Sequence, residues 1–521
     1  MLEILIGVTL FFTLWRVLVL ADLKRRQKKS GYGYPPIASN GLLGWRGLVH
    51  QLSGFVKDIG PAGWGAQFKE HGKTHLYPVF PTQLLVTRDP DNVKAILATQ
   101  FKDFSFGIRK EALCPSLGYG IFTVEGSSWS HSRALLRPQF SREQISRLDS
   151  VEHHFQEFAQ CVDNFKGEYF DIQKLFFAQS MDTSTDFLLG ESVGCLKELL
   201  ETRDGDESSK KFGANFQHAF DRVQRLVALR VVFQENYWII GDVFFRNEFR
   251  QVNELIQKFV QGYVDKALKA RAHKAPIYTN PDKYIFLYEL ARDTTNPRVL
   301  RDQVLNILIA GRDTTAATLS WLMFELAQKP HIFHKLRKAV IEDFGTTIEN
   351  ISFESLKQCE YLRYVLNEVL RLHPVVPINL RVALKDTTLP RGGGPNGDEP
   401  IFVPKGQKIN YAVYWTHRDE QYWGEDAEEF KPERWDTTNH PGPLGKGWEF
   451  LPFNGGPRIC LGQQFALTEM GYILTRLVQE YSDIGIDEEY HDRPLRVRHS
   501  ITMSHGDGVH VRLSREGTVV S

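Results

Sequence analysis

An uninterrupted helical pattern from Arg301 to Gln328 sets the scale of the fold. At 1.5 Å per residue this helix would be about 40 Å long, enough to cross a large domain. Its centre is Ala310–Thr315 (AGRDTT), although glycine costs on the order of 1 kcal/mol relative to alanine in a helix interior and threonine is a poor helix former. Hydroxyl groups there can bond to backbone carbonyls and open a groove. The cluster therefore indicates a functional opening, and a harmless polar seam is the alternative.

The composition predicts a folded body with a sizeable core, and the residue spacing predicts that the body is mainly helical; length alone would suit about three domains or one large one. Of 521 residues, 42% are hydrophobic and 12% aromatic, which excludes disorder because such a chain can bury a sizeable core. With 63 basic against 63 acidic residues, the chain lacks the basic excess that nucleic-acid binding requires, so we expect no nucleic-acid partner. Short β-type segments occur near residues 84–87 and 401–403, and no linker divides residues 41–521. We predict an α+β domain with small β-sheets. Further helical patterns cover Gln144–Phe165, Gln251–His273, Ile332–Phe344, Leu356–Leu372 and Gln464–Tyr481.

The N-terminus predicts attachment to a membrane. Residues 1–23 are apolar apart from a few polar positions, and the run reaches the roughly 20 residues of a bilayer span if Arg16 snorkels. Residues 24–40 follow with a basic cluster and the Pro35–Pro36 hinge. Because the positive charges lie after the apolar run, we expect a single-pass transmembrane helix with the body, residues 41–521, in the cytosol. A helix lying on the membrane surface is the alternative.

The five cysteines direct attention to Cys460. They are too few and too scattered for a disulfide scaffold, which suits a reducing compartment. Cys460 lies in Phe453–Gly462 (FNGGPRICLG), where Gly455 and Gly456 permit a tight turn. A helical pattern follows directly, so the thiol would lie near a helix N-terminus, which favours the thiolate, with Arg458 nearby. Cys460 could be a nucleophile or a metal ligand, and a buried inert thiol is the third possibility.

The loop resembles the haem-binding loop of cytochromes P450, whose pattern is Phe-x-x-Gly-x-Arg-x-Cys-x-Gly. Three further segments match motifs of that family in the family's order: Trp129–Arg133, Glu368–Arg371 and Pro432–Trp435, the last with Trp435 in place of phenylalanine. The resemblance covers essentially the whole chain. It implies a single large cytochrome P450 haem domain of mainly α structure.

The resemblance assigns roles to particular residues. It implies that Cys460 is the axial thiolate ligand of haem b and that Asp313 and Thr314 are the catalytic acid–alcohol pair that delivers protons. Glu368, Arg371 and Arg434 would form a buried structural network. Haem contacts are expected from Trp129, Arg133, Arg381, Phe453 and Arg458, with the arginines suited to the propionates. His131 is expected to be solvated or packed rather than an iron ligand.

Within the family, the chain is most similar to the fungal n-alkane and fatty-acid hydroxylases. Four segments carry this likeness: Phe104–Thr123, Asp182–Ser192, Leu389–Gly397 and Phe453–Glu469. The residues expected to face substrate are almost all bulky and apolar, which suits an aliphatic ligand, although core packing is the alternative at each position. They are Phe106, Leu117, Ile121, Ile307, Ala310, Val376, Ile378 and Met503.

The expected function is hydroxylation of a lipophilic, long-chain aliphatic substrate with NADPH and O₂. Electrons would come through a separate flavoprotein, NADPH–cytochrome P450 reductase, because no flavin-binding segment follows the haem domain. The expected location is the endoplasmic reticulum membrane, with membrane lipid and a lipophilic small molecule as further partners. Alternatives are a P450 that tailors a polyketide or terpenoid, a haem-binding sensor or carrier without turnover, and a family member that rearranges peroxides.

Overall fold

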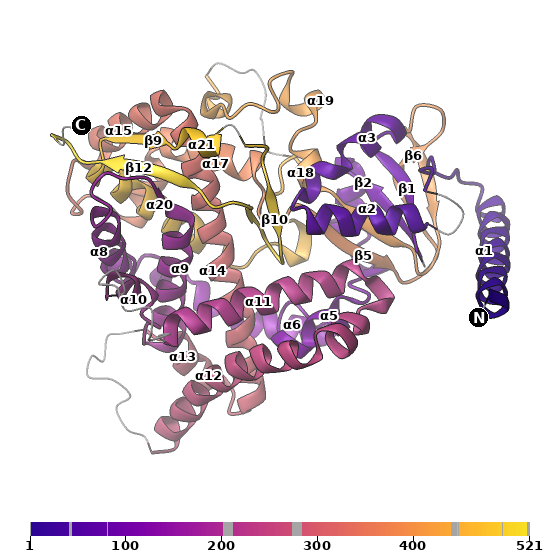
Figure 1. Ribbon diagram of the computed structural model, residues 1–521, viewed down its shortest axis with the longest axis horizontal. Helices are drawn as coiled ribbons and strands as arrows, with labels where there is room; N and C mark the ends of the chain where they lie inside the picture. The colour runs from indigo at the N-terminus through magenta and orange to yellow at the C-terminus, as the bar shows by residue number, and fades with distance from the viewer. Residues whose placement is uncertain are drawn as a thin grey trace. The chain divides into compact units, whose positions relative to one another are not determined.

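The computed structural model describes residues 2–40, 44–80, 82–201, 212–273, 284–438, 445, 447–491 and 493–517. The chain forms two compact units, each assembled from separate stretches of sequence. The strand-rich unit comprises Met1–Gly107, Val376–Glu429 and Pro441–Cys460, and the helical unit comprises Ile108–Val375, Phe430–His440 and Leu461–Ser521. Helices dominate the chain, as predicted, and the sheets are small (Figure 1).

The strand-rich unit is built on a five-stranded sheet in the order β1-β2-β8-β5-β3. Neighbouring strands are antiparallel except β2 and β8, which are parallel. Both faces of the sheet are covered: Leu85 and Ile409 belong to one buried cluster, and Leu84 and Val86 to another. Burial on both faces explains why Leu84–Thr87 reads as a continuous buried run. The strands are β1 Thr74–Val79, β2 Thr82–Thr87, β3 Phe104–Ser105, β5 Asn379–Ala383 and β8 Lys408–Tyr411.

Short helices and one hairpin complete this unit. The hairpin pairs β6 with β7 and contains the predicted β-type segment near residues 401–403. Helix α2 lies alongside β1 (Figure 1). The elements are α2 Trp45–Val56, α3 Gly65–His71, α4 Pro90–Lys94, η2 Ala95–Thr99, β6 Thr387–Gly393, β7 Glu399–Val403, α18 Val413–Thr416, α19 Glu420–Trp423 and η9 Gly456–Arg458.

Helix α1, Leu2–Ser30, contains the whole N-terminal apolar run. It continues through the basic cluster without a break, because lysine and arginine are good helix formers and the chain first turns at Gly31. Within the described residues, no helix combines the length with the apolar character that a membrane span requires. The transmembrane span of residues 1–23 stays a prediction.

The helical unit is organised around α14, Pro297–Gln328. The helix begins four residues before the predicted start, because Asn296 caps it by accepting hydrogen bonds from the backbone N–H groups of Arg298 (3.0 Å) and Val299 (3.3 Å) and Pro297 occupies the first turn. Its 32 residues correspond to about 48 Å. Helix α9, Ile172–Leu189, runs beside it (Figure 1).

The remaining helices and two small sheets surround this pair. One sheet has the order β4-β12-β9 and the other pairs β10 with β11. The elements are α5 Arg109–Leu117, α6 Gly126–Leu136, α7 Arg142–Ile145, α8 Asp149–Asp163, β4 Phe170–Asp171, α10 Cys195–Glu201, α11 Phe212–Val232, α12 Arg246–His273, α13 Phe286–Asp293, α15 Pro330–Phe344, α16 Phe353–Gln358, α17 Glu360–Leu372, α20 Gln463–Glu480, β9 Asp483–Ile486, α21 Glu488–His491, β10 Val497–His499, β11 Met503–His505 and β12 His510–Ser514.

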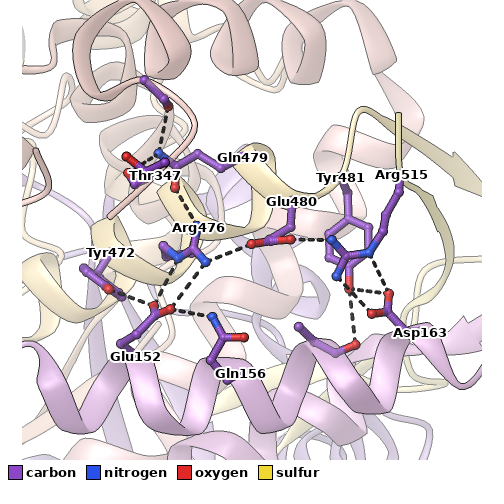
Figure 2. Close-up of polar contacts among 12 residues, drawn as sticks. Glu152, Gln156, Asp163, Thr347, Tyr472, Arg476, Gln479, Glu480, Tyr481 and Arg515 are labelled. Carbon is purple, nitrogen blue, oxygen red and sulfur yellow. Dashed lines mark hydrogen bonds and ion pairs between the residues drawn. The ribbon is translucent and has the colours of Figure 1, made fainter. Parts of the chain in front are cut away.

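A polar network fixes α20, the helix that follows the Cys460 loop in sequence (Figure 2). Glu152 of α8 accepts hydrogen bonds from Tyr472 (2.7 Å) and from Nε of Arg476 (3.0 Å). Arg476 also donates to Glu480 at 2.8 Å. At the end of α20, Arg515 donates both to Glu480 of that helix and, at 2.9 Å, to Asp163 at the end of α8. These charges are neutralised in place, so α8 and the C-terminal strand region hold α20 at both its middle and its end.

Candidate active site

The Cys460 loop is shaped by a close approach of two backbone segments in the strand-rich unit. Gly456 has φ = 67°, in the left-handed region, and a Cβ there would lie 1.9 Å from the carbonyl oxygen of Leu97 in η2. The loop is closed by the Cys460 N–H, which donates to the carbonyl oxygen of Phe453 at 2.9 Å. Only glycine fits at position 456, and the loop geometry that precedes the cysteine therefore depends on it.

Cys460 differs from the other cysteines in its exposure. All five lie among the described residues, and none is in a disulfide. Burial raises the pKa of the Cys114, Cys161, Cys195 and Cys359 thiols, to about 12 for Cys161 and Cys359. Cys460 alone is exposed. It is thus the thiol best placed to bind a metal such as iron, and the chemistry of the loop fits a haem thiolate ligand.

Two of the predicted haem-contact arginines meet at one aromatic ring in the same unit. The guanidinium carbons of Arg458 and Arg381 lie 4.1 Å and 4.6 Å from the ring centroid of Phe106. Arg381 is 3% exposed and is also held by the carbonyl oxygen of Leu380. Phe106, predicted to face substrate, is 5% exposed and packs against these cations. Two guanidinium groups held together on one ring suit a ligand carboxylate such as a propionate.

The centre of α14, in the helical unit, presents a partly exposed stripe on an otherwise buried helix. Ile307, Ala310, Gly311 and Thr314 are each partly exposed, whereas the positions between them are buried. Their spacing of i, i+3, i+4 and i+7 places them on one helix face. Two predicted pocket residues and the predicted catalytic threonine therefore share this face, which we call the α14 stripe.

The hydroxyl groups of this region bond back to the helix without opening it. Thr314 Oγ1 donates to the carbonyl oxygen of Ala310 at 2.7 Å, and Thr318 Oγ1 donates to that of Thr314 at 2.7 Å. The backbone is helical throughout the AGRDTT cluster. Packing of α14 along α9 compensates for the low helix propensity of the glycine and threonines in this cluster. The accessible surface of the α14 stripe therefore does not come from a break in the helix.

Asp313 is next to Thr314 in sequence but is 2% exposed and contacts a different group of residues. It accepts a hydrogen bond from Nη1 of Arg312 at 2.8 Å, and the same nitrogen binds Asp221 of α11. Burial raises the pKa of Asp313 to about 6, although Arg312 opposes this shift. Asp313 can therefore gain and lose a proton close to neutral pH.

Glu368, Arg371 and Arg434 form a buried network at the end of α17. Both Arg371 nitrogens donate to the Glu368 carboxylate, at 2.9 Å and 2.8 Å, and Nε of Arg434 lies 3.3 Å from it. Trp435, where the family pattern has phenylalanine, adds an indole N–H that donates to Glu368 at 2.9 Å. The backbone N–H of Lys431 donates at 2.9 Å. Glu368 and Arg371 are fully buried, so these partners satisfy charges that would otherwise be costly.

The remaining residues predicted to contact haem are Trp129, Arg133 and Phe453. Trp129 and Arg133 are both partly exposed on α6, and the Arg133 guanidinium carbon lies 5.8 Å from the Trp129 ring centroid. Phe453 is partly exposed and His131 is exposed.

The predicted pocket residues divide between the two units. Phe106, Val376 and Ile378 belong to the strand-rich unit, and the others belong to the helical unit. Leu117 and Ile121 are buried in a segment held by α14, because Asn306 donates to the Leu117 carbonyl oxygen at 2.8 Å and Asp302 accepts from the Tyr119 N–H at 2.8 Å. Met503 is fully buried.

Sequence reasoning missed three groups near the predicted residues. Asp302 and Asn306 fix the 117–122 segment. The sequence pattern that could have indicated them is a pair of polar residues four positions apart in an otherwise apolar helix. Glu469 of α20 is 4% exposed and accepts a 3.5 Å hydrogen bond from Thr315, the residue after Thr314. Burial raises the pKa of Glu469 to about 8.

Comparison with known proteins identifies the family of the chain. The Cytochrome P450 family model matches residues 65–492. The chain is 45% identical to Cytochrome P450 52A12 of Debaryomyces hansenii over 529 residues, which covers 97% of this chain and 98% of that protein. It is 45% identical to Cytochrome P450 52A9 of Candida maltosa, covering 90% and 89% of the two chains, and 48% identical to Cytochrome P450 52A10 of the same yeast, covering 83% and 82%. The resemblance seen in the motifs is confirmed along nearly the whole sequence, and the chain belongs to the cytochrome P450 family of haem-thiolate monooxygenases.

Proposed function

We propose that this monooxygenase hydroxylates a long-chain aliphatic substrate, an n-alkane or a fatty acid. The α14 stripe carries the proposal: Ile307, Ala310 and Gly311 offer apolar, partly exposed surface beside the Thr314 hydroxyl, and the stripe contains no charged side chain. Such a surface binds a hydrocarbon chain and excludes water. The likeness of four sequence segments to the fungal n-alkane and fatty-acid hydroxylases, together with the similarity to the three 52A cytochromes P450, supports this substrate class over a polyketide or terpenoid.

Cys460 would bind the iron of haem b, with the propionates held by Arg381 and Arg458 and by Trp129 and Arg133, and with Phe453 against the ring. The exposed thiol and the glycine-shaped loop support this assignment. When bound, haem supplies the iron that activates dioxygen, and thiolate ligation favours cleavage of the O–O bond.

Thr314 and Asp313 would deliver the protons that this chemistry consumes. The Thr314 hydroxyl lies on the α14 stripe, where it can hold a proton at the reacting surface while it bonds to Ala310. Asp313, the preceding residue, is buried off this face and has a pKa of about 6, so it can accept a proton and pass it on near neutral pH. The buried network of Glu368, Arg371 and Arg434 would serve to hold α17 and the segment after it in place.

Electrons would come from NADPH through a separate flavoprotein, NADPH–cytochrome P450 reductase. We propose residues 1–23 as a membrane anchor, residues 24–40 as the basic cluster and hinge, and residues 41–521 as the haem domain in the cytosol at the endoplasmic reticulum. Four apolar side chains of α1 are 61–65% exposed, which supports contact with lipid: Leu10, Phe11, Leu14 and Leu18. Deleting residues 2–30 should release the protein from membranes, and extraction at alkaline pH distinguishes a spanning anchor, which resists it, from surface attachment. Retention of the truncated protein on membranes would contradict the role of α1.

The substrate is tested by optical titration and turnover of the holoenzyme. An n-alkane or a long-chain fatty acid should shift the haem spin state, stimulate NADPH consumption in the presence of reductase, and yield an alcohol that carries one atom from ¹⁸O-labelled O₂. A response to terpenoids or polyketides alone would contradict the aliphatic assignment. Binding of haem without any stimulated NADPH consumption would indicate a sensor or carrier.

Thr314→Ala tests proton delivery, and Thr318→Ala is its matched control. Both threonines bond to the carbonyl four residues earlier at 2.7 Å, but Thr318, one turn further along the same helix, is buried at 2% exposed, whereas Thr314 is partly exposed. We expect Thr314→Ala to divert NADPH electrons into peroxide while Thr318→Ala keeps product formation coupled. Unchanged coupling in Thr314→Ala would contradict its role.

A further inference from the structure

Arg312 is a fully buried cation that the proposed chemistry does not use. It is 0% exposed, and its Nη1 contacts two carboxylates, that of Asp313 at 2.8 Å and that of Asp221 on α11. Within the described part of the chain, its Nε and Nη2 have no hydrogen-bond partner. Burial of this arginine costs desolvation free energy, which one nitrogen shared between two acids offsets only in part. Such an arrangement suggests a role other than stability.

Aromatic rings and a backbone contact fix Arg312 between α9 and α11. Its guanidinium carbon lies 4.6 Å from the ring centroid of Phe177 on α9 and 5.6 Å from that of Phe220 on α11. Ser180 of α9 donates to the Arg312 carbonyl oxygen at 2.7 Å. The Arg312 side chain therefore has little freedom to move. How its positive charge is neutralised depends on where the carboxylates of Asp313 and Asp221 lie.

Helix α11 supplies the second acid from an accessible position. The Asp221 side chain is 52% exposed, whereas that of Asp313 is 2% exposed. Gln224, one turn later on α11, is buried and hydrogen-bonds to Asp313. Among the described residues, the charged groups that face Asp313 are Arg312 and Asp221. Helix α9 contacts Arg312 through Phe177 and Ser180. The positive charge of Arg312 also lowers the pKa of the buried Cys195 thiol at the start of α10, although burial raises that pKa more.

We propose that Asp221 is a positioning residue for Asp313: by sharing the Arg312 nitrogen that Asp313 binds, it weakens the Arg312–Asp313 ion pair and leaves Asp313 able to carry a proton. Helix α11 thereby controls the proton-carrying state of a carboxyl on α14. The effect of Asp221 on catalysis rests on the proposed function of Asp313 in proton delivery. The electrostatic coupling between Asp221 and Asp313 does not depend on that function.

The direction of the coupling follows from the charges. Burial and the negative charge of Asp221 raise the pKa of Asp313, and Arg312 lowers it. Removing the charge of Asp221 leaves the whole Arg312 cation to Asp313, so the pKa of Asp313 must fall. The carboxyl would then stay ionised at neutral pH and could not donate a proton.

The variants that test this are Asp221→Asn, Asp221→Glu and Glu248→Gln. Asp221→Asn removes the charge at a half-exposed position, and Asp221→Glu restores it. Glu248→Gln is the matched control, because Glu248 of α12 tethers the next residue of α11, Arg222, through a 2.9 Å contact and does not touch Arg312. A merely structural role of α11 would show in both neutral variants, whereas the proposed competition shows only in Asp221→Asn.

The measurement is the infrared carbonyl band of the protonated Asp313 carboxyl, identified in the holoenzyme as the band that Asp313→Asn removes and followed against pH. We expect its midpoint to fall by about one pH unit in Asp221→Asn, since a nearby charge moves a pKa by this order, and to stay near the wild-type value in Asp221→Glu and Glu248→Gln. An unchanged midpoint in Asp221→Asn, an equal shift in Glu248→Gln, or the absence of such a band from the wild type would overturn the proposal.

A second measurement separates this inference from the proposed function. The fraction of NADPH electrons recovered in product, measured against pH with reductase, should move with the carbonyl band in Asp221→Asn. If the band moves and the coupling profile does not, Asp221 positions the charge of Asp313 as proposed and the role of Asp313 in proton delivery is wrong.

Discussion

Glu469 offers a sharp test of the buried electrostatics beside α14. Its carboxyl is 4% exposed on α20 and accepts a hydrogen bond from Thr315 at 3.5 Å. No charged group among the described residues contributes to its pKa, which burial raises from an ordinary 4.5 to about 8. At pH 7 the folded protein should therefore hold Glu469 protonated, while the unfolded chain holds it ionised.

The magnitude of the effect follows from proton linkage. Between about pH 4.5 and pH 8 the folded state binds one more proton than the unfolded state at this position, so the free energy of unfolding falls as the pH rises. The slope is about 1.4 kcal/mol per pH unit, which gives a loss of about 2.5 kcal/mol between about pH 5 and pH 7. Glu469→Gln keeps the shape and the acceptor for Thr315 but cannot ionise. The variant should therefore lose less stability over this range.

The assay is guanidinium unfolding of wild type and Glu469→Gln at several pH values across this window. The difference between their free energies of unfolding should change by about 2.5 kcal/mol between about pH 5 and pH 7, in favour of the variant at the higher pH. Glu480→Gln, on the same helix, is the control, since Glu480 is paired with Arg476 and Arg515. A constant difference between wild type and Glu469→Gln would refute the reasoning.

Three further substitutions probe the loop and its supports. Gly456→Ala should abolish most haem incorporation, measured by the reduced CO spectrum, because its Cβ would lie 1.9 Å from the Leu97 carbonyl oxygen; normal incorporation would contradict the close approach. Glu368→Ala should cost about 3–5 kcal/mol in denaturant unfolding, since it leaves buried arginines unpaired, whereas Glu360→Ala at the exposed start of the same helix should cost little. Asn306→Ala should weaken substrate binding in spin-state titration, because it removes two hydrogen bonds to the 117–122 segment; an unchanged affinity would separate that segment from the pocket.

Local patterns in the sequence were enough to predict the long helix and a tight glycine turn before Cys460, whereas the haem assignment came from the resemblance to cytochromes P450. The α14 pattern was visible because its apolar residues repeat with helical spacing, and its start was missed by four residues although Asn296 and Pro297 carry an ordinary cap signal. The glycine turn was visible because two consecutive glycines, Gly455 and Gly456, lie just before Cys460 and permit unusual backbone dihedral angles. What the glycines do was not visible, since the contact of Gly456 with Leu97 joins segments more than three hundred residues apart.

Residues that act through long-range contacts escaped prediction for the same reason. Asp221 lies in an ordinary amphipathic helix, and nothing in its neighbours indicates that it meets Arg312. The family pattern has phenylalanine where this chain has Trp435, and the sequence alone did not indicate that the indole adds a hydrogen bond to Glu368 that phenylalanine cannot make. Division of the chain into two units was also hidden, because each unit is assembled from three separate stretches of sequence.

The reduced CO difference spectrum tests the central assignment of Cys460 most directly. Wild type should show the red-shifted absorption of thiolate-ligated haem, and Cys460→Ala should lose it. Cys359→Ala should keep the absorption, because burial raises the pKa of that thiol to about 12 and it has no access to a ligand. Retention of the red-shifted band in Cys460→Ala would contradict the account.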